Sequence, residues 1–293
     1  MSPDRAAIRT NSARRCASRY TIYSRYVSFL ESSREAVRAS SIRREAIEEF
    51  DEADRTDHSL FLRLVHDQLA IYHGQRNDAA IDEVHCTVVG KFRRIFGYAH
   101  WRTVTAIHKY GQMLCGEKRY EEAEALYRTL VDEVDRDRGP EPVPVLCIFN
   151  ALSVVYAKRQ KLKEAEAILV RAVVGFQERS GERDLRTLTA AFNLGGVYQD
   201  RGKLSHAIRA YHGAAHGFHN LMGISYKTTI TAFTQLAALC SARRAFPEAE
   251  EAYTLALQGL KAAARQDSID GLILKLDLGI LYRDVQRLRP PRS

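Results

Sequence analysis

Three histidines have the spacing that most directly suggests metal chemistry in this chain. His212, His216 and His219 follow one another at helical intervals, and two histidines four residues apart on one helix can ligate zinc. A zinc protease of this pattern also needs a glutamate after the first histidine as its general base. Gly213 occupies that position. We therefore expect neither a metal site nor a cofactor.

The cysteines do not form a pattern that binds metal or builds disulfides. The sequence has five, an odd number: Cys16, Cys86, Cys115, Cys147 and Cys240. They lie far apart, no pair has metal-ligand or CxxC spacing, and none stands in a sequence context typical of a nucleophile. A reducing compartment suits such a chain, so we expect a cytoplasmic protein.

Other signatures of catalysis are also missing from the sequence. Gly195 and Gly196 are not followed by the lysine and hydroxyl residue of a phosphate-binding loop. Together with the isolated cysteines, this pattern predicts a protein that is not an enzyme.

The net charge of +8 is compatible with an acidic protein, a nucleic acid or an anionic membrane as partner. Basic pairs such as Arg93-Arg94 and Arg243-Arg244 are not interleaved with aromatic residues, as a platform for single-stranded nucleic acid would require. No apolar run approaches the ~18 to 20 residues that cross a bilayer. We expect neither nucleic acid nor membrane as partner; a nucleic-acid-binding repeat would rest on net charge alone.

The N-terminal segment is rich in arginine and serine and contains a single acid, Asp4, in its first 25 residues. We interpret residues 1–19 as a basic, disordered tail. The same composition is typical of a mitochondrial presequence, which leaves a mitochondrial location as the alternative.

The sequence contains a repeat of 42 residues, which indicates the structural elements that position these side chains. One register contains Tyr120, Leu162, Leu204, Phe246 and Leu288, and each step is 42. Two further registers agree, and their members are small: Ala123, Ala165, Ala207 and Ala249, and Gly111, Ser153, Gly195, Ala237 and Gly279. A constant period of this size predicts a solenoid, in which each unit buries its apolar face against its neighbours.

Each repeat is expected to form two helices joined by a tight turn. In residues 184–219, apolar residues follow three-and-four spacing in two runs, separated by a polar turn in which Gly202 can adopt a left-handed conformation. The array is predicted over 58–288, with units at 58–97 (degenerate), 101–138, 143–180, 184–220, 226–264 and 269–288 (incomplete). An N-terminal helical cap is expected at 20–57 and a short tail at 289–293.

The last predicted helix has no second helix to cover it. Leu272, Ile273, Leu276, Ile280 and Leu281 make it apolar nearly all round, whereas solenoids usually end in a polar capping face. Either the array is shortened, or this helix supports self-association.

The repeat resembles the tetratricopeptide pattern, which has a small residue, a tyrosine three positions later and an alanine in the second helix. A tetratricopeptide repeat usually has ~34 residues. The longer repeat, with Thr103 and Thr187 near the start of first helices and the segment 120–127 opening a second helix, resembles the repeats of kinesin light chains. The resemblance covers about 58–288 and implies an all-α, right-handed superhelical solenoid of antiparallel helix pairs.

The resemblance also implies a binding surface. In such proteins the first helices line a concave groove, where asparagines hydrogen-bond the backbone of an extended peptide; amides suit this because they both donate and accept. The matching residues are Asn150, Asn193 and Gln235, with Thr105, His108, Gln112, Gln199, Thr231 and Thr234 on the same face and Lys158 and Arg201 at its rim. For any single residue, capping a turn or facing water is the alternative.

These observations predict a non-enzymatic adaptor that binds a protein or peptide partner in its concave groove. Similar repeats form the C-terminal arrays of nucleotide-binding signalling proteins in fungi and bacteria. A regulatory or sensor module derived from such a protein is therefore the alternative.

Overall fold

The computed structural model describes residues 38, 41, 42, 47, 65–70, 72, 75, 77–137, 139 and 141–288. The basic tail expected at 1–19, the tail at 289–293 and most of the cap expected at 20–57 lie outside these residues. The chain divides into two compact units, Met1–Ile107 and His108–Ser293. The second contains the surfaces discussed below.

Every regular element in the described part of the chain is an α-helix, as the sequence predicted. The helices along the described residues from 77 to 288 are α4 (Asp78–Phe96), α5 (Trp101–Gly116), α6 (Tyr120–Asp137), α7 (Val143–Lys158), α8 (Leu162–Ser180), α9 (Leu185–Asp200), α10 (Leu204–Met222), α11 (Lys227–Ala242), α12 (Phe246–Ala262) and α13 (Ile269–Leu288). Among the described residues, no helix has the length and hydropathy needed to cross a membrane.

The helix starts keep the 42-residue period of the sequence. First helices begin at Trp101, Val143, Leu185, Lys227 and Ile269, and second helices begin at Tyr120, Leu162, Leu204 and Phe246. Helix α4 begins at Asp78, one period before α6. Because every helix start recurs at one interval, side chains 42 positions apart occupy equivalent places in their repeats.

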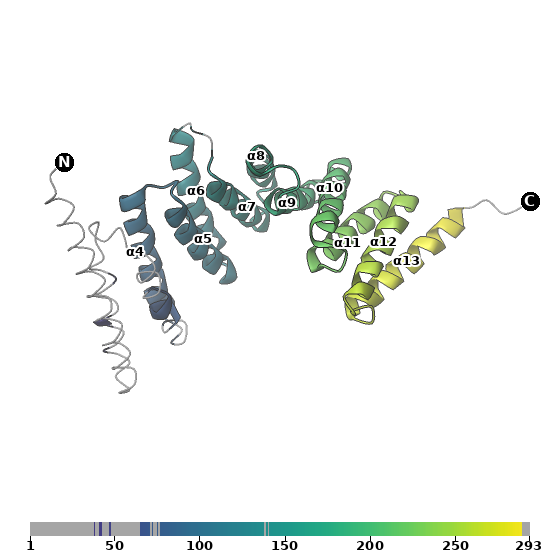
Figure 1. The fold of residues 1–293 in the computed structure, drawn as a ribbon, viewed down its shortest axis with the longest axis horizontal. Coiled ribbons are helices and arrows are strands. Elements are labelled where there is room, and N and C mark those ends of the chain that lie inside the picture. Colours follow the sequence, from purple (N-terminus) through teal and green to yellow (C-terminus); the bar gives the residue numbers. More distant parts are fainter. Residues whose placement is uncertain are drawn as a thin grey trace, which may run out of the picture. The chain divides into compact units, whose positions relative to one another are not determined.

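The second unit is a stack of helix pairs (Figure 1). Helices α7 and α8, α9 and α10, and α11 and α12 pack within their pairs, while α8 contacts α9 and α10 contacts α11 to join successive pairs. Each helix therefore buries one face within its own pair and a second against a neighbour, as expected of a solenoid.

The small residues lie where two helices approach most closely. A Cβ atom added to Gly195 would meet the Tyr211 ring at 2.9 Å, and one added to Gly111 would overlap the Tyr127 ring. Such contacts leave no room for a larger side chain. Gly279 has open space in place of this contact; it lies on α13, which lacks a following second helix among the described residues.

The turn between paired helices also repeats. Lys118, Gln160, Gly202 and Arg244 all have left-handed backbone, with φ of 62°, 59°, 71° and 60°. The left-handed conformation expected at Gly202 is confirmed. Only this one of the four positions is glycine, the residue that adopts such φ values without steric cost.

We expect Ala165→Arg to destabilise the array strongly. Ala165 is fully buried and packs with Leu169, Leu194 and Val197 at the joint between two repeats. An arginine there has to displace packed side chains or carry its charge into the core, at a cost of about 3 kcal/mol or more. Thermal unfolding should show a sharply lower midpoint, whereas the neighbouring exposed variant Glu164→Arg should change it little. An unchanged midpoint for Ala165→Arg would mean that the register is wrong.

Candidate functional site

Most of the predicted groove residues belong to α7, α9, α11 and the part of α5 from His108 on, which together we call the first-helix face; Thr105 lies in the first unit, and Arg201 follows the end of α9. Three hollows within the described residues lie along this face. The Asn150 hollow has a volume of about 580 Å³, the Asn193 hollow about 340 Å³ and the Thr231 hollow about 380 Å³. Each is named after a predicted site residue that lines it.

The Asn150 hollow brings together three of the predicted residues. His108 and Gln112 from α5 lie around it with Asn150 from α7. Apolar side chains complete the wall: Val154, Phe176 and Leu185. The hollow therefore combines hydrogen-bonding groups with apolar surface, as sites that hold a peptide side chain usually do.

The Asn193 hollow adjoins it. Asn193 and Lys158 line this hollow, and Val154 lines both. Across the junction the side-chain amide of Asn193 donates a hydrogen bond to the side-chain oxygen of Asn150, at 2.9 Å. In the part of the chain that the structure describes, this is the only side-chain hydrogen bond of either amide. Asn150 therefore retains both of its side-chain N–H donors, and Asn193 retains its side-chain oxygen as an acceptor.

Burial favours the neutral form of the His108 imidazole. Burial lowers the pKa of its imidazole below the usual value, because a charged ring is poorly solvated in a partly buried position. A neutral imidazole presents one donor and one acceptor.

The two cysteines in the Asn150 hollow are thiols. Burial raises the pKa of both the Cys115 and the Cys147 side chains, so the thiolate that nucleophilic catalysis requires is disfavoured. The hollow thus offers hydrogen-bonding and apolar groups, and its cysteines are poorly suited to act as nucleophiles.

The predicted threonines use their hydroxyl donors internally. Thr105, Thr231 and Thr234 each donate to the carbonyl oxygen four residues earlier, at 2.7, 3.0 and 2.8 Å. Thr231 and Thr234 line the Thr231 hollow, where their hydroxyl oxygens remain able to accept. Gln235 is half-buried on α11 and does not line any of the three named hollows.

Gln199 and Arg201 make contacts within the fold. The Tyr211 hydroxyl lies 3.3 Å from the side-chain oxygen of Gln199, to which it donates. Arg201 pairs with the Glu166 carboxylate of the preceding repeat. Its guanidinium therefore ties two repeats together at the position where a groove rim was expected.

This ion pair belongs to a repeated clamp that the sequence analysis missed. Glu166 binds Arg201 and Lys203, the latter at 2.8 Å. One period earlier, Glu124 binds Arg159 and Lys161, both at 2.6 Å. The signal was present in the sequence as a glutamate, an arginine and a lysine that each recur after 42 residues. At the next step the glutamate becomes Ile208 and the lysine becomes Ala245.

The clamp carboxylates are held ionised. Burial alone would raise the pKa of Glu124, but hydrogen bonds and charges from Lys161 and Arg159 outweigh it and lower the pKa below the usual value. The same balance with Lys203 and Arg201 lowers the pKa of Glu166. Charged partners stabilise the carboxylate more than partial burial destabilises it.

The three histidines considered for metal binding face the next repeat. The rings of His212 and His216 are 4.4 Å apart, and His216 and His219 both pack edge-on against Phe233 of α11. Within the described ranges no group of three histidine, cysteine or acidic side chains is arranged to hold a metal ion.

Comparison with known proteins agrees with this architecture. Residues 144–212 match the family model for the tetratricopeptide repeat. BtubC (BKLC) from P. vanneervenii shares the fold with a TM-score of 0.57 at 17% identity, covering 78% of this chain and 94% of that chain. The kinesin light chain TPR-like repeats of Podosopora anserina have a TM-score of 0.57 at 16% identity, covering 64% and 90%.

A Rap protein with Competence and Sporulation Factor has a TM-score of 0.50 at 12% identity, covering 92% of this chain and 73% of that chain. No curated protein matches the sequence.

The fold is that of a tetratricopeptide-like solenoid with kinesin-light-chain-like repeats, an architecture that presents extended surfaces for protein–protein interaction.

We expect Glu124→Gln to lower the free energy of unfolding by about 1 to 3 kcal/mol, because it removes a buried, doubly charge-assisted carboxylate. The folded-state pKa of Glu124 is lowered, so its stabilisation is complete above the ordinary carboxyl pKa and is lost as pH falls through the folded-state value. The difference between wild type and variant in urea unfolding should shrink as pH falls from about 6 to about 3.

The matched control is Glu121→Gln. Glu121 also pairs with Arg159, at 3.0 Å, but its side chain is 72% exposed, so its loss should cost less than about 1 kcal/mol. If both variants lowered the free energy of unfolding equally, the role assigned to the clamp would be contradicted. The same holds if the difference between wild type and Glu124→Gln did not change with pH.

Proposed function

We propose that this chain is a non-enzymatic adaptor that holds an extended peptide segment of another protein on its first-helix face. The observation that carries the proposal is the hydrogen-bonded pair of Asn150 and Asn193 at the junction of two adjoining hollows.

The amide pair suits a peptide backbone. One peptide unit offers a carbonyl acceptor and an N–H donor, and the pair retains free groups of both kinds. A segment crossing this junction can bond to the amides through its backbone and place alternate side chains in the Asn150 and Asn193 hollows. Backbone bonds of this kind would supply affinity and the hollows specificity, as in other modes of extended-peptide recognition.

The surrounding groups support binding rather than chemistry. Burial disfavours the thiolates of Cys115 and Cys147 as it disfavours the charged form of His108. The Rap protein whose fold this chain shares was crystallised with Competence and Sporulation Factor, which supports ligand binding by a solenoid of this type. We further propose a cytoplasmic location, because Cys86, Cys115, Cys147 and Cys240 are free thiols.

We expect the double variant Asn150→Ala/Asn193→Ala to fold normally and to bind peptides more weakly. The probe is a displayed library of random peptides selected on the wild-type protein, with affinities of the selected peptides then measured by fluorescence anisotropy. Loss of two hydrogen bonds of about 1 kcal/mol each should weaken binding by roughly ten- to thirtyfold.

Gln258→Ala is the matched control, since it removes an exposed amide from the second helix of another repeat. It should leave affinity unchanged. Selected peptides that bind the double variant as tightly as the wild type would rule out the proposed groove.

We also propose that the chain self-associates through α13. Four of its large apolar side chains are at least half exposed: Ile269, Leu272, Ile273 and Leu276. The corresponding face of α11 is covered by α12, whereas Gly279 has open space beside it. A second copy of α13 would cover this surface.

We expect Leu276→Glu to prevent self-association, because it places a charge in the middle of the apolar surface. Light scattering with size exclusion should show a dimer for the wild type and a monomer for the variant. Gln258→Glu adds the same charge on α12 and should remain dimeric. A wild-type protein that stays monomeric at its highest soluble concentration would exclude this proposal.

A further inference from the structure

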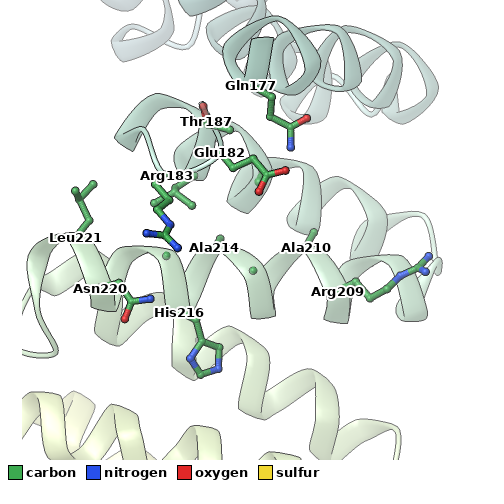
Figure 2. A pocket seen from close by; sticks show the side chains of 14 residues that line it. Gln177, Glu182, Arg183, Thr187, Arg209, Ala210, Ala214, His216, Asn220 and Leu221 are labelled. Atoms are coloured by element: carbon green, nitrogen blue, oxygen red, sulfur yellow. The ribbon is translucent and has the colours of Figure 1, made fainter. Parts of the chain in front are cut away.

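A hollow between second helices differs in character from those on the first-helix face. This Gly213 hollow has a volume of about 540 Å³ and is lined by residues of α8, α9 and α10 and of the turn between α8 and α9. Figure 2 shows Gln177 and Glu182 pointing toward α10, whereas the side chain of His216, which belongs to α10, points away from the hollow. The ring of His216 packs instead against Phe233, at 5.3 Å between centroids.

One repeat earlier, the position equivalent to the hollow is occupied by an arginine side chain that stacks on an aromatic ring. The Arg171 guanidinium lies 4.7 Å from the centroid of the Phe149 ring. The same guanidinium donates to Asp135 at 2.6 Å and to Glu141 at 2.8 Å. Two carboxylates and one aromatic face thus hold a single cation.

The 42-residue equivalence shows how the hollow arises. Phe149 corresponds to Ala191 and Arg171 corresponds to Gly213, and both of these small residues line the hollow. The substitutions remove an aromatic ring and the long side chain stacked on it from an otherwise repeated backbone. The hollow therefore has room for a large, flat side chain.

The charges around the hollow are also reversed. Asp135 corresponds to Gln177 and Glu141 corresponds to Arg183, so the carboxylates that held a guanidinium are replaced by an amide and a cation. Arg209 adds a second cation, leaving Glu182 as the one carboxylate among the lining residues.

Arg183 and Arg209 form no ion pair with any described residue, in contrast to Arg171, Arg159 and Arg201. The hollow now disfavours a guanidinium and favours a ligand that carries a carboxylate.

We propose that the Gly213 hollow binds an aromatic side chain of a partner peptide whose next residue is acidic. The aromatic ring occupies the space that side chains equivalent to Phe149 and Arg171 would fill, and the carboxylate pairs with Arg183, while Arg209 adds positive charge at the other end of the hollow (Figure 2). Arg183 can also lie over the bound ring, which would re-create between two chains the arginine–aromatic contact that the preceding repeat makes within one. This site is separate from the first-helix face and does not depend on peptide binding there.

The test uses the full chain and a blocked tetrapeptide, acetyl-Ala-Trp-Glu-Ala-amide, with 5-fluorotryptophan as the aromatic residue. Binding is followed by fluorine NMR line broadening. Gly213→Arg should weaken binding about tenfold, a loss of roughly 1.4 kcal/mol, because it returns an arginine to the hollow. A Cβ at Gly213 meets no atom within 4 Å, so the variant should fold. Its thermal midpoint, compared with that of Gly213→Ala, checks this.

Four comparisons locate the binding. Gly213→Ala leaves most of the space open and should bind as the wild type does. The matched probe with lysine in place of glutamate should bind more weakly to the wild type, and Arg183→Glu should reduce or reverse that preference. Asn150→Ala/Asn193→Ala should leave binding intact, which separates this site from the first-helix face.

The proposal is overturned if the probe does not bind at millimolar concentration. Equal affinity of the glutamate and lysine probes would also overturn it, as would equal affinity for the wild type and Gly213→Arg. Binding lost only in Asn150→Ala/Asn193→Ala would assign the probe to the first-helix face.

Discussion

The architecture depends on the close approach of paired helices, made possible where a small residue lies under an aromatic ring. Gly195 beneath Tyr211 and Gly111 beneath Tyr127 leave no space for a Cβ atom. The contact excludes water so well that burial raises the pKa of Tyr211 to about 12. Because a small residue recurs at this place in every repeat, as Ser153 and Ala237 show between and after the two glycines, each helix pair can bury the same face against the next.

A backbone that repeats so regularly allows single side chains to create local sites. The glutamate clamp joins two successive repeat boundaries and is lost at the third, where Ile208 replaces the acid. Arg171 fills a slot in one repeat, while Gly213 leaves the equivalent slot open in the next. Such differences distinguish repeats that share a backbone, so a uniform array can carry separate binding surfaces.

Much of the site could be placed from the sequence but its contacts could not. The resemblance put Asn150 and Asn193 on one face, and the structure brings their amides within hydrogen-bonding distance. Arg201 was expected at a groove rim, yet it pairs with Glu166 from the preceding repeat. Periodicity places residues on a face of a helix; it does not say which side chain of a neighbouring repeat lies within reach.

The sequence by itself determined the helix pairs, their period and the small-residue contacts, because these depend on local spacing and side-chain size. Tertiary structure decided which polar groups remain free for a ligand and which are used between repeats. It also decided that Gly213 opens a hollow, since Gly213, Ala191, Gln177 and Arg183 meet only when α8, α9 and α10 are packed together. These properties depend on distances between residues far apart in the chain, which only the packed array brings together.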